Sequence, residues 1–338
     1  MGDLWTAFKQ SPYYPATGLV LLLSAAAGLF AGSYTYAMAS PTPHHMPVAV
    51  VGVTHETVRG RVFAAGLEKA LAASLDLHFD KSYAQAMESI EEQRVFAVFV
   101  VRETHVDMNV SSASGASVAL LLSQEAPKVA ARTGFTLTVR DVKPLQRADP
   151  RGLAIFYITL AAVIIGFTGA IQLSNNAPDL NPGERIAFTA AYAVLGAFAI
   201  VSLVDWVLGA LELPVPESWF ILALTMFTTG MVFTMFNTFL GRWAMVPTWG
   251  LMVLLGNPSS GGAVSWPLLP SPLGVIGRWL PPGASVNAQH TAVYFHGHQS
   301  VTPFIVLMAW ALVSCAVFLI WRERHPGGRP ARPTPTTS

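Results

Sequence analysis

Few residues in this sequence have side chains suited to chemistry, and an acid within an apolar run is the first candidate. Asp205 interrupts such a run, and an acid inside a membrane span predicts a functional site facing a wet pathway. The alternative is an acid that snorkels to the headgroups beside Trp206. In a later apolar run, Asn237 predicts either a polar seam along a pathway or ordinary hydrogen bonds between helices.

Histidines gather between the apolar runs. His44 and His45 precede a polar region, while His290, His296 and His298 precede the last apolar run. The order His-Gly-His favours two imidazoles on one side of an extended segment, which would be a partial metal site. No carboxylate or thiolate accompanies them, so we expect loop histidines and no bound metal.

Motifs for catalysis or nucleotide binding are missing from the sequence. It holds no Gly-x-x-x-x-Gly-Lys loop, no Gly-x-Ser-x-Gly elbow, no His-Glu-x-x-His helix and no Cys-x-x-Cys pair. We therefore expect no enzyme activity and no cofactor, and any use of ATP requires a separate subunit. Cys315 is the single cysteine, which excludes an intramolecular disulfide, and a net charge of +1 argues against nucleic-acid binding.

Composition indicates a membrane protein. Of the 338 residues, 52% are hydrophobic and 12% are charged, against roughly 25% charged in an ordinary soluble domain. Mean hydropathy is +0.47. Such a chain has too little polar surface to cover a water-soluble globule, so we expect a bilayer to cover the apolar excess.

Five apolar runs are long enough for the helix of about 20 residues that crosses the hydrocarbon of a membrane. A sixth, 243–255, is only about 13 residues long and is either a span or a re-entrant segment. Counting it as a span, we predict an α-helical integral membrane protein with six transmembrane helices and an inserted small α/β extracytoplasmic domain. The five long runs are 17–39, 152–173, 186–210, 219–240 and 303–321.

Basic residues set the expected orientation, because the cytoplasmic flanks of spans carry Lys and Arg. The loop 212–217 holds no base, and the loop 257–301 holds only Arg278. We therefore expect a multi-pass protein of the inner (plasma) membrane with both termini in the cytoplasm and 40–151 outside. The flanks assigned to the cytoplasm hold Lys9, Arg185, Arg242, Arg322, Arg324, Arg329 and Arg332.

The N-terminal part predicts a cytoplasmic interfacial helix over 1–16, followed by the first span. Residues 37–39, Ala-Met-Ala, are compatible with signal-peptide cleavage, but the apolar run is longer than the usual h-region of about 7–15 residues. Ser24, Gly28 and Gly32 form a small-residue ridge that predicts close helix packing, within or between subunits.

Residues 40–151 carry most of the Asp, Glu and Lys and have the size of an ordinary domain. Apolar runs, alternation and helical spacing predict the order strand–helix–strand–helix–strand–strand–helix–strand, a small α/β layer structure with a mixed sheet. Ser82 and Gln85 predict a capped helix start. The rest of the chain divides into a five-helix transmembrane domain, 152–321, and a disordered cytoplasmic tail, 322–338.

Two further segments are distinctive. In the loop 175–184, Asn181 is suited to cap a helix, Pro182 fits its first turn and Glu184 favours its N-terminus. This predicts a short helix that touches a cytoplasmic partner, or else a plain capped loop. Segment 257–295 mixes Pro and Gly with apolar residues, which is typical of broken, half-inserted helices that line a cavity at the outer face.

Segment 257–295 contains the runs Leu-Pro-x-Pro-Leu-x-x-Ile-Gly and Leu-Pro-x-Gly-Ala. It resembles the outer re-entrant region of bacterial ABC type-2 exporter permeases. The whole topology is similar to that of permeases with a large external domain after the first span, the YhgE/Pip (phage infection protein) group. One departure is Arg102-Glu103 after the strand at 95–101, where that group usually has a Pro-containing turn, so no ligand role is carried over from its domain.

The resemblance implies a homodimer or heterodimer whose spans form a pathway for an amphipathic or lipid-like substrate, driven by a cytoplasmic ATPase subunit. It also implies an ATPase-coupling loop made of Pro182, Gly183, Glu184 and Arg185. The alternative function is a non-transporting membrane scaffold or receptor whose external domain binds a secretion, cell-wall or phage partner. The residues expected in the pathway and outer gate are Asp205, Asn237, Pro270, Pro272, Gly277, Pro281 and Gly283.

Overall fold

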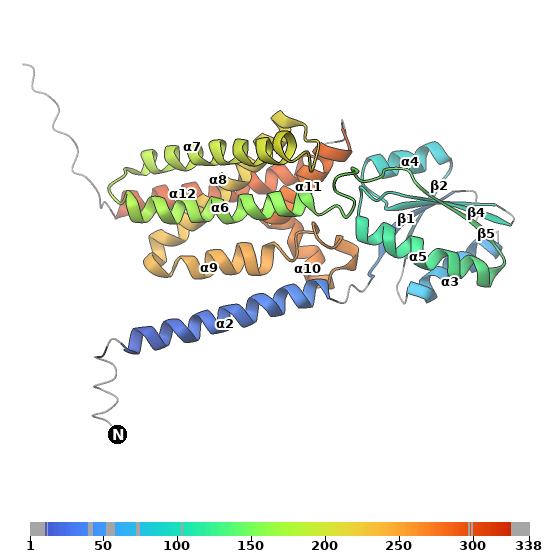
Figure 1. The fold of residues 1–338 in the computed structure, drawn as a ribbon, viewed down its shortest axis with the longest axis horizontal. Helices are drawn as coiled ribbons and strands as arrows, with labels where there is room; N and C mark the ends of the chain where they lie inside the picture. The colour runs from blue at the N-terminus through green and yellow to red at the C-terminus, as the bar shows by residue number, and fades with distance from the viewer. Residues whose placement is uncertain are drawn as a thin grey trace, which may run out of the picture.

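The structure, a computed structural model, describes residues 11, 13–39, 43–51, 58–71, 75–102, 104–296, 298 and 300–325. It has two parts, a bundle of long helices and a small α/β domain at one end of that bundle (Figure 1). Most of the expected interfacial helix, 1–16, and of the expected tail, 322–338, lies outside the described residues.

Five helices are long and apolar enough to cross a membrane, which confirms the five expected runs and indicates a multi-pass membrane protein. The sixth run forms a shorter apolar helix, α9 (Met245–Trp249), continued by the π-helical η3 (Gly250–Gly256). The six-span topology therefore stays a prediction. The long helices are α2 (Tyr13–Met38), α6 (Ala154–Asn176), α7 (Pro182–Val201) with its π-helical extension η1 (Ser202–Val207), α8 (Val215–Leu240) and α12 (Thr302–Arg324).

Helices α6, α7 and α8 pack closely because small residues lie where they cross. A β-carbon at Gly166 of α6 would lie 2.7 Å from the carbonyl oxygen of Met226 in α8. The Tyr192 hydroxyl of α7 reaches between them and donates a hydrogen bond of 2.5 Å to the Gly166 carbonyl. Gly230 of α8 faces the same hydroxyl. Close contact at small residues and buried hydroxyl bonds are the interactions typical of membrane helices.

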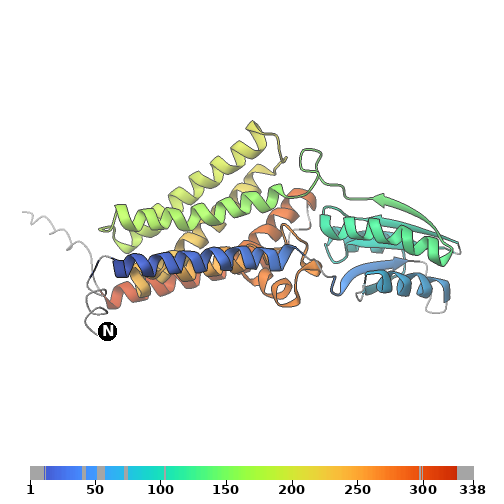
Figure 2. The same ribbon diagram turned by 60° about the horizontal axis from the view of Figure 1, so that its bottom comes forward.

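Helix α2 is separated from most of the bundle in Figure 1 and runs along the length of the bundle in Figure 2. Among its described side chains only Ala37 is buried. It touches the α9–η3 region, where the rings of Phe30 and Trp249 stack with centroids 6.2 Å apart. A β-carbon added at Gly28 or Gly32 would meet nothing within 4 Å. The expected small-residue ridge therefore does not pack within the described chain.

The α/β domain has the five strands and three helices in the expected order, and its sheet is mixed as expected. The strand order is β2-β1-β3-β4-β5, with β3 and β4 antiparallel and the other neighbours parallel. The elements are β1 (Met46–Val51), α3 (Val58–Leu71), β2 (Leu75–Asp80), α4 (Tyr83–Glu91), β3 (Ala97–Val101), β4 (His105–Val110), α5 (Ala116–Thr133) and β5 (Thr136–Asp141).

The two faces of the sheet are covered by different helices. Successive side chains of a strand point to opposite faces. On β1, Val48 and Val50 therefore enter a core shared with α3 and α5, whereas Ala49 enters a second core shared with α4. The expected cap of α4 is present, because the Ser82 hydroxyl accepts the Gln85 N–H at 3.3 Å.

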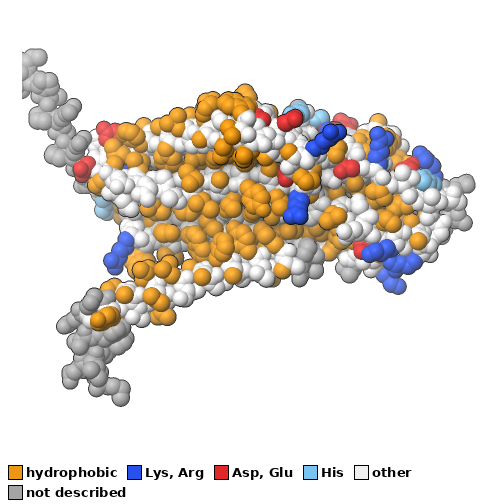
Figure 3. All heavy atoms as spheres, in the orientation of Figure 1, with side chains coloured by type: hydrophobic (Ala, Val, Ile, Leu, Met, Phe, Trp, Pro, Cys, Tyr) orange, Lys and Arg blue, Asp and Glu red, His pale blue; other side chains and the backbone are white. Residues whose placement is uncertain are grey.

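Charged side chains gather on the α/β domain and at the ends of the bundle, whereas the visible side of the bundle is mainly apolar (Figure 3). Arg185, Arg242 and Arg322 lie at the end away from the sheet, in the first turn of α7, just after α8 and in the last turn of α12. A basic end on an apolar bundle fits the expected cytoplasmic side. The orientation itself stays a prediction.

Candidate functional site

The segment between η3 and α12 folds as a series of short helices at the end of the bundle nearest the sheet (Figure 1). They are η4 (Trp266–Leu268), α10 (Ser271–Ile276), η5 (Gly277–Trp279) and α11 (Pro281–Tyr294). Prolines lie at the starts of two of them, with Pro270 at the N-cap of α10, Pro272 in its first turn and Pro281 at the start of α11. The predicted broken helices are therefore present; we call this part, 257–295, the outer segment.

At two of the expected outer-gate residues, Gly277 and Gly283, different parts of the outer segment approach each other closely. A β-carbon at Gly277 would collide with the carbonyl oxygen of Ser259, and one at Gly283 would collide with the carbonyl oxygen of Gly277. These obstacles are backbone atoms, which cannot rotate away as a side chain does, so both positions require glycine. The contacts join the turn after η3, η5 and the first turn of α11 into one tightly packed layer.

The α/β domain is anchored on the outer segment through both of its hydrophobic cores. Leu268 of η4 is 2% exposed and belongs to the core under α3 and α5. Phe295, directly after α11, is 1% exposed and belongs to the core under α4. The rings of Phe96 and Trp266 add a contact with centroids 6.1 Å apart. The cores of the domain are therefore completed by residues far outside 40–151.

Hydrogen bonds supplement this apolar anchoring. Gln93 Nε2 donates to Thr291 Oγ1 of α11 at 2.8 Å. The Ser265 N–H donates to Ser117 Oγ in the first turn of α5 at 2.9 Å. Asp149 accepts two backbone N–H groups at the start of α6, at 3.0 and 2.9 Å, where the domain continues into the bundle. The junction is thus fixed by both apolar and polar contacts.

A cavity of about 370 Å³ lies where the α/β domain, the outer segment and the start of α12 meet. We call it the junction cavity. Its charged lining residues are Arg151 and Arg278, and no Asp or Glu of the described chain lines it. The polar lining residues are Gln93, Ser112, Ser114, Ser117, Arg151, Ser259, Ser260, Ser265, Arg278, Asn287, His290, Ser300 and Thr302.

His290 is half-buried in the wall of this cavity. Loss of solvation lowers its pKa to about 4, and a hydrogen bond to the Ala113 backbone and the charge of Asp149 only partly offset this effect. Its ring centroid lies 6.0 Å from that of Tyr294, where burial raises the pKa of the phenol to about 12. Neither group changes protonation near neutral pH, so neither is suited to acid–base chemistry there.

Asp205 and Asn237 lie at opposite ends of the bundle, so the structure does not bring these two expected pathway residues together. Asp205 is half-buried in η1 near the sheet, whereas Asn237 is half-buried in the last turn of α8, away from it. Between them, Thr228 Oγ1 donates to the Leu307 carbonyl of α12 at 3.3 Å and to its own helix at 2.7 Å. These hydrogen bonds, one of them between helices, explain why a threonine lies here without a polar pathway.

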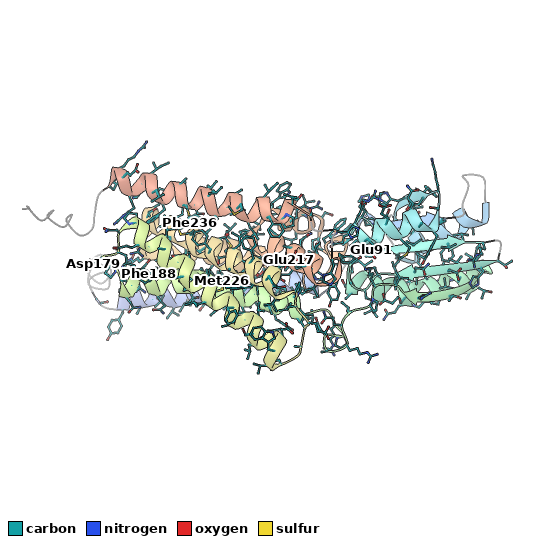
Figure 4. All side chains as sticks on the ribbon, turned by 90° about the horizontal axis from the view of Figure 1, so that it is seen from above. Glu91, Asp179, Phe188, Glu217, Met226 and Phe236 are labelled. Atoms are coloured by element: carbon teal, nitrogen blue, oxygen red, sulfur yellow. The ribbon has the colours of Figure 1, made fainter. Side chains whose placement is uncertain are left out.

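The loop between α6 and α7, expected to couple to an ATPase, lies at the end of the molecule away from the sheet. Figure 4 shows Asp179 of this loop at that end and Glu91 of α4 in the domain at the other. As expected, Pro182 begins α7, and Glu184 Oε2 accepts the Asn181 N–H at 2.9 Å. Gly183, between them, is exposed.

Arg185 turns back into the same loop instead of facing solvent. Its guanidinium donates to Ser174 Oγ at 2.8 Å and to the Ala177 carbonyl at 3.2 Å. The charges of Glu184 and Arg185 therefore stabilise the loop itself. Asp179 and Glu184 are both exposed, and of the two Asp179 is the one not used in the helix cap.

The structure gives no support to a metal site. Among the described residues, no group of three or more His, Cys, Asp or Glu side chains is placed to hold a metal ion. The His298 N–H donates to the Phe295 carbonyl at 3.0 Å. This segment therefore makes a turn instead of the extended run on which the partial metal site depended.

Sequence reasoning missed the residues that form the junction, above all Arg151, Leu268 and Phe295. The sequence did carry one signal. Arg151 and Arg278 lie in the part assigned to the outside, although basic residues near spans are usually cytoplasmic. No protein-family model matches the sequence, and neither a curated protein nor a solved structure matches it. The likeness to exporter permeases therefore stays a prediction.

Proposed function

We propose that this chain is the membrane permease subunit of an exporter for an amphipathic or lipid-like substrate, energised by a separate cytoplasmic ATPase. In this proposal the chain crosses the inner membrane six times as part of a dimer, with the α/β domain outside. The observation that carries the proposal is the anchoring of both domain cores on the outer segment, through Leu268 and Phe295. A domain held in this way must move together with the outer segment.

The path of α9–η3 supports a sixth span. It starts next to the end of α8 away from the sheet, after the turn η2 (Gly241–Trp243). Its last residue, Gly256, packs against Pro282 of α11, which lies 2.7 Å from the position of an added β-carbon. The helix therefore runs from the basic end of the bundle to the outer segment. π-helical stretches such as η3 are rare, and those that occur often lie at functional sites.

The loop before α7 supports contact with a cytoplasmic subunit. Its backbone is fixed internally by Glu184 and Arg185, and Asp179 and Phe188 are exposed near it (Figure 4). A rigid, exposed loop at the basic end is suited to transmit a conformational change of an ATPase subunit to α6 and α7. Because Glu184 and Arg185 maintain the loop, the contact is better tested at Asp179.

The experiment is purification from native membranes followed by assay of ATP hydrolysis in the eluate. The wild-type protein should retain an ATPase, and Asp179→Lys should lose it. Asp76→Lys, the same charge reversal on the exposed edge strand β2, is the matched control and should retain it. The absence of ATPase from the wild-type eluate, together with unchanged efflux in a deletion strain, would refute transport and favour the scaffold or receptor.

A further inference from the structure

The junction cavity has a charge pattern that the proposed transport function does not by itself explain. Its two charged lining residues are both arginines, and no carboxylate of the described chain lines it. Among the described residues, neither Arg151 nor Arg278 forms an ion pair. Arg278 instead lies over the Trp266 ring, 5.5 Å from its centroid. Two guanidinium groups at one cavity favour an anion, although the charge of Asp149 reaches the cavity wall at His290.

The backbone around the cavity adds to this preference. The N-terminus of α5 contributes Gly115, Ala116 and Ser117 to its lining, and this helix has no side-chain cap. The N-terminal end of a helix carries partial positive charge and free N–H groups. Such an end is a recurrent place for binding phosphate.

The remaining lining residues identify the kind of anion. Polar side chains such as those of Ser112, Asn287 and Thr302 line the cavity and can donate hydrogen bonds to a group with several oxygens. The volume of about 370 Å³ is in the range of small-molecule pockets. Apolar walls at Leu145 and Val286 leave room for a less polar portion of the ligand.

We propose that the junction cavity binds a phosphate-bearing group, with Arg151 and Arg278 as its charged contacts. The phosphate belongs either to the headgroup of a lipid or to a small water-soluble molecule. This assignment concerns binding by the isolated chain and holds whether or not the protein transports its ligand.

The test is titration calorimetry on the purified full-length protein in a neutral detergent. The probes are a short-chain phosphatidic acid, inorganic phosphate and the diacylglycerol of the same chain length, which lacks the phosphate. Phosphatidic acid should bind and the diacylglycerol should not. Arg151→Gln and Arg278→Gln should each weaken binding at least about tenfold, because each removes a charge-assisted contact. Arg132→Gln, the same change at the far end of α5, should leave it unchanged.

The outcomes separate the sources of the phosphate. Binding of inorganic phosphate as tight as that of phosphatidic acid, with the same arginine dependence, would support a small soluble ligand. Tighter binding of phosphatidic acid would support a lipid. Equal binding of the diacylglycerol, or equal losses for Arg132→Gln and the two cavity variants, would overturn the proposal. If a glutamine variant unfolds, the salt dependence of binding to the wild-type protein is the second measurement: affinity for phosphatidic acid should fall as salt rises, and an affinity independent of salt would overturn the proposal.

Discussion

Replacement of Gly277 by alanine tests the packing of the outer segment. The added β-carbon would collide with the carbonyl oxygen of Ser259, an obstacle that only a backbone shift removes. Forcing an extra methyl group into a packed site costs about 1–3 kcal/mol. Gly250→Ala is the matched control, because its β-carbon would meet nothing within 4 Å. Alanine at this helical position should stabilise by roughly 0.5–1 kcal/mol.

The two variants should therefore differ in stability by about 1.5–4 kcal/mol, from the sum of the two effects. This corresponds to a separation of at least about 3 °C in the melting midpoint for a chain of this size. Thermal melting of the purified proteins in the same detergent measures it. Equal midpoints for Gly277→Ala and Gly250→Ala would refute the close approach of Gly277 to Ser259, and with it the rigid outer segment.

Three further predictions concern other contacts. Gly230→Ala should destabilise the protein, and adding Tyr192→Phe should relieve much of that loss because the obstructing atom is the Tyr192 hydroxyl. Thermal melting of the single and double variants checks this, and stability losses that simply add in the double variant would contradict it. Leu268→Ala should lower the free energy of unfolding by about 2–5 kcal/mol and make the α/β domain more sensitive to proteolysis, although Leu268 lies outside that domain. Protection from proteolysis equal to that of the wild-type protein would contradict the anchoring. Burial lowers the pKa of His290 from 6.5 to about 4. As the pH falls from 6.5 to 4, His290 is therefore protonated in the unfolded chain before it is protonated in the folded one, and the protein loses stability. His290→Gln should flatten the plot of melting midpoint against pH in this range, and an unchanged slope would contradict the prediction.

The sequence was sufficient to predict the elements of the α/β domain. Runs such as 48–51 and alternation such as that of Leu75, Leu77 and Phe79 reflect local periodicity, which depends on neighbours a few residues away. The same holds for the five long helices and for the caps at Ser82 and Asn181. These features need no knowledge of which distant segments meet.

The site was harder to predict because its contacts join distant parts of the chain. Leu268 and Phe295 lie in a segment that already had a membrane interpretation, so nothing local marked them as part of the cores of the α/β domain. The requirement for glycine at Gly277 arises from the Ser259 carbonyl, which belongs to a different turn. Asp205 and Asn237 were grouped by residue type, and the chain path places them at opposite ends of the bundle.

In the proposed arrangement the bundle crosses a membrane, with the α/β domain on one side and the loop before α7 on the other. Single cysteines at Asp76→Cys and Asp179→Cys, in a Cys315→Ser background, test it with a membrane-impermeant maleimide. We expect intact cells to label the cysteine at position 76, and to label that at position 179 only after permeabilisation. Equal labelling of both positions in intact cells would contradict it.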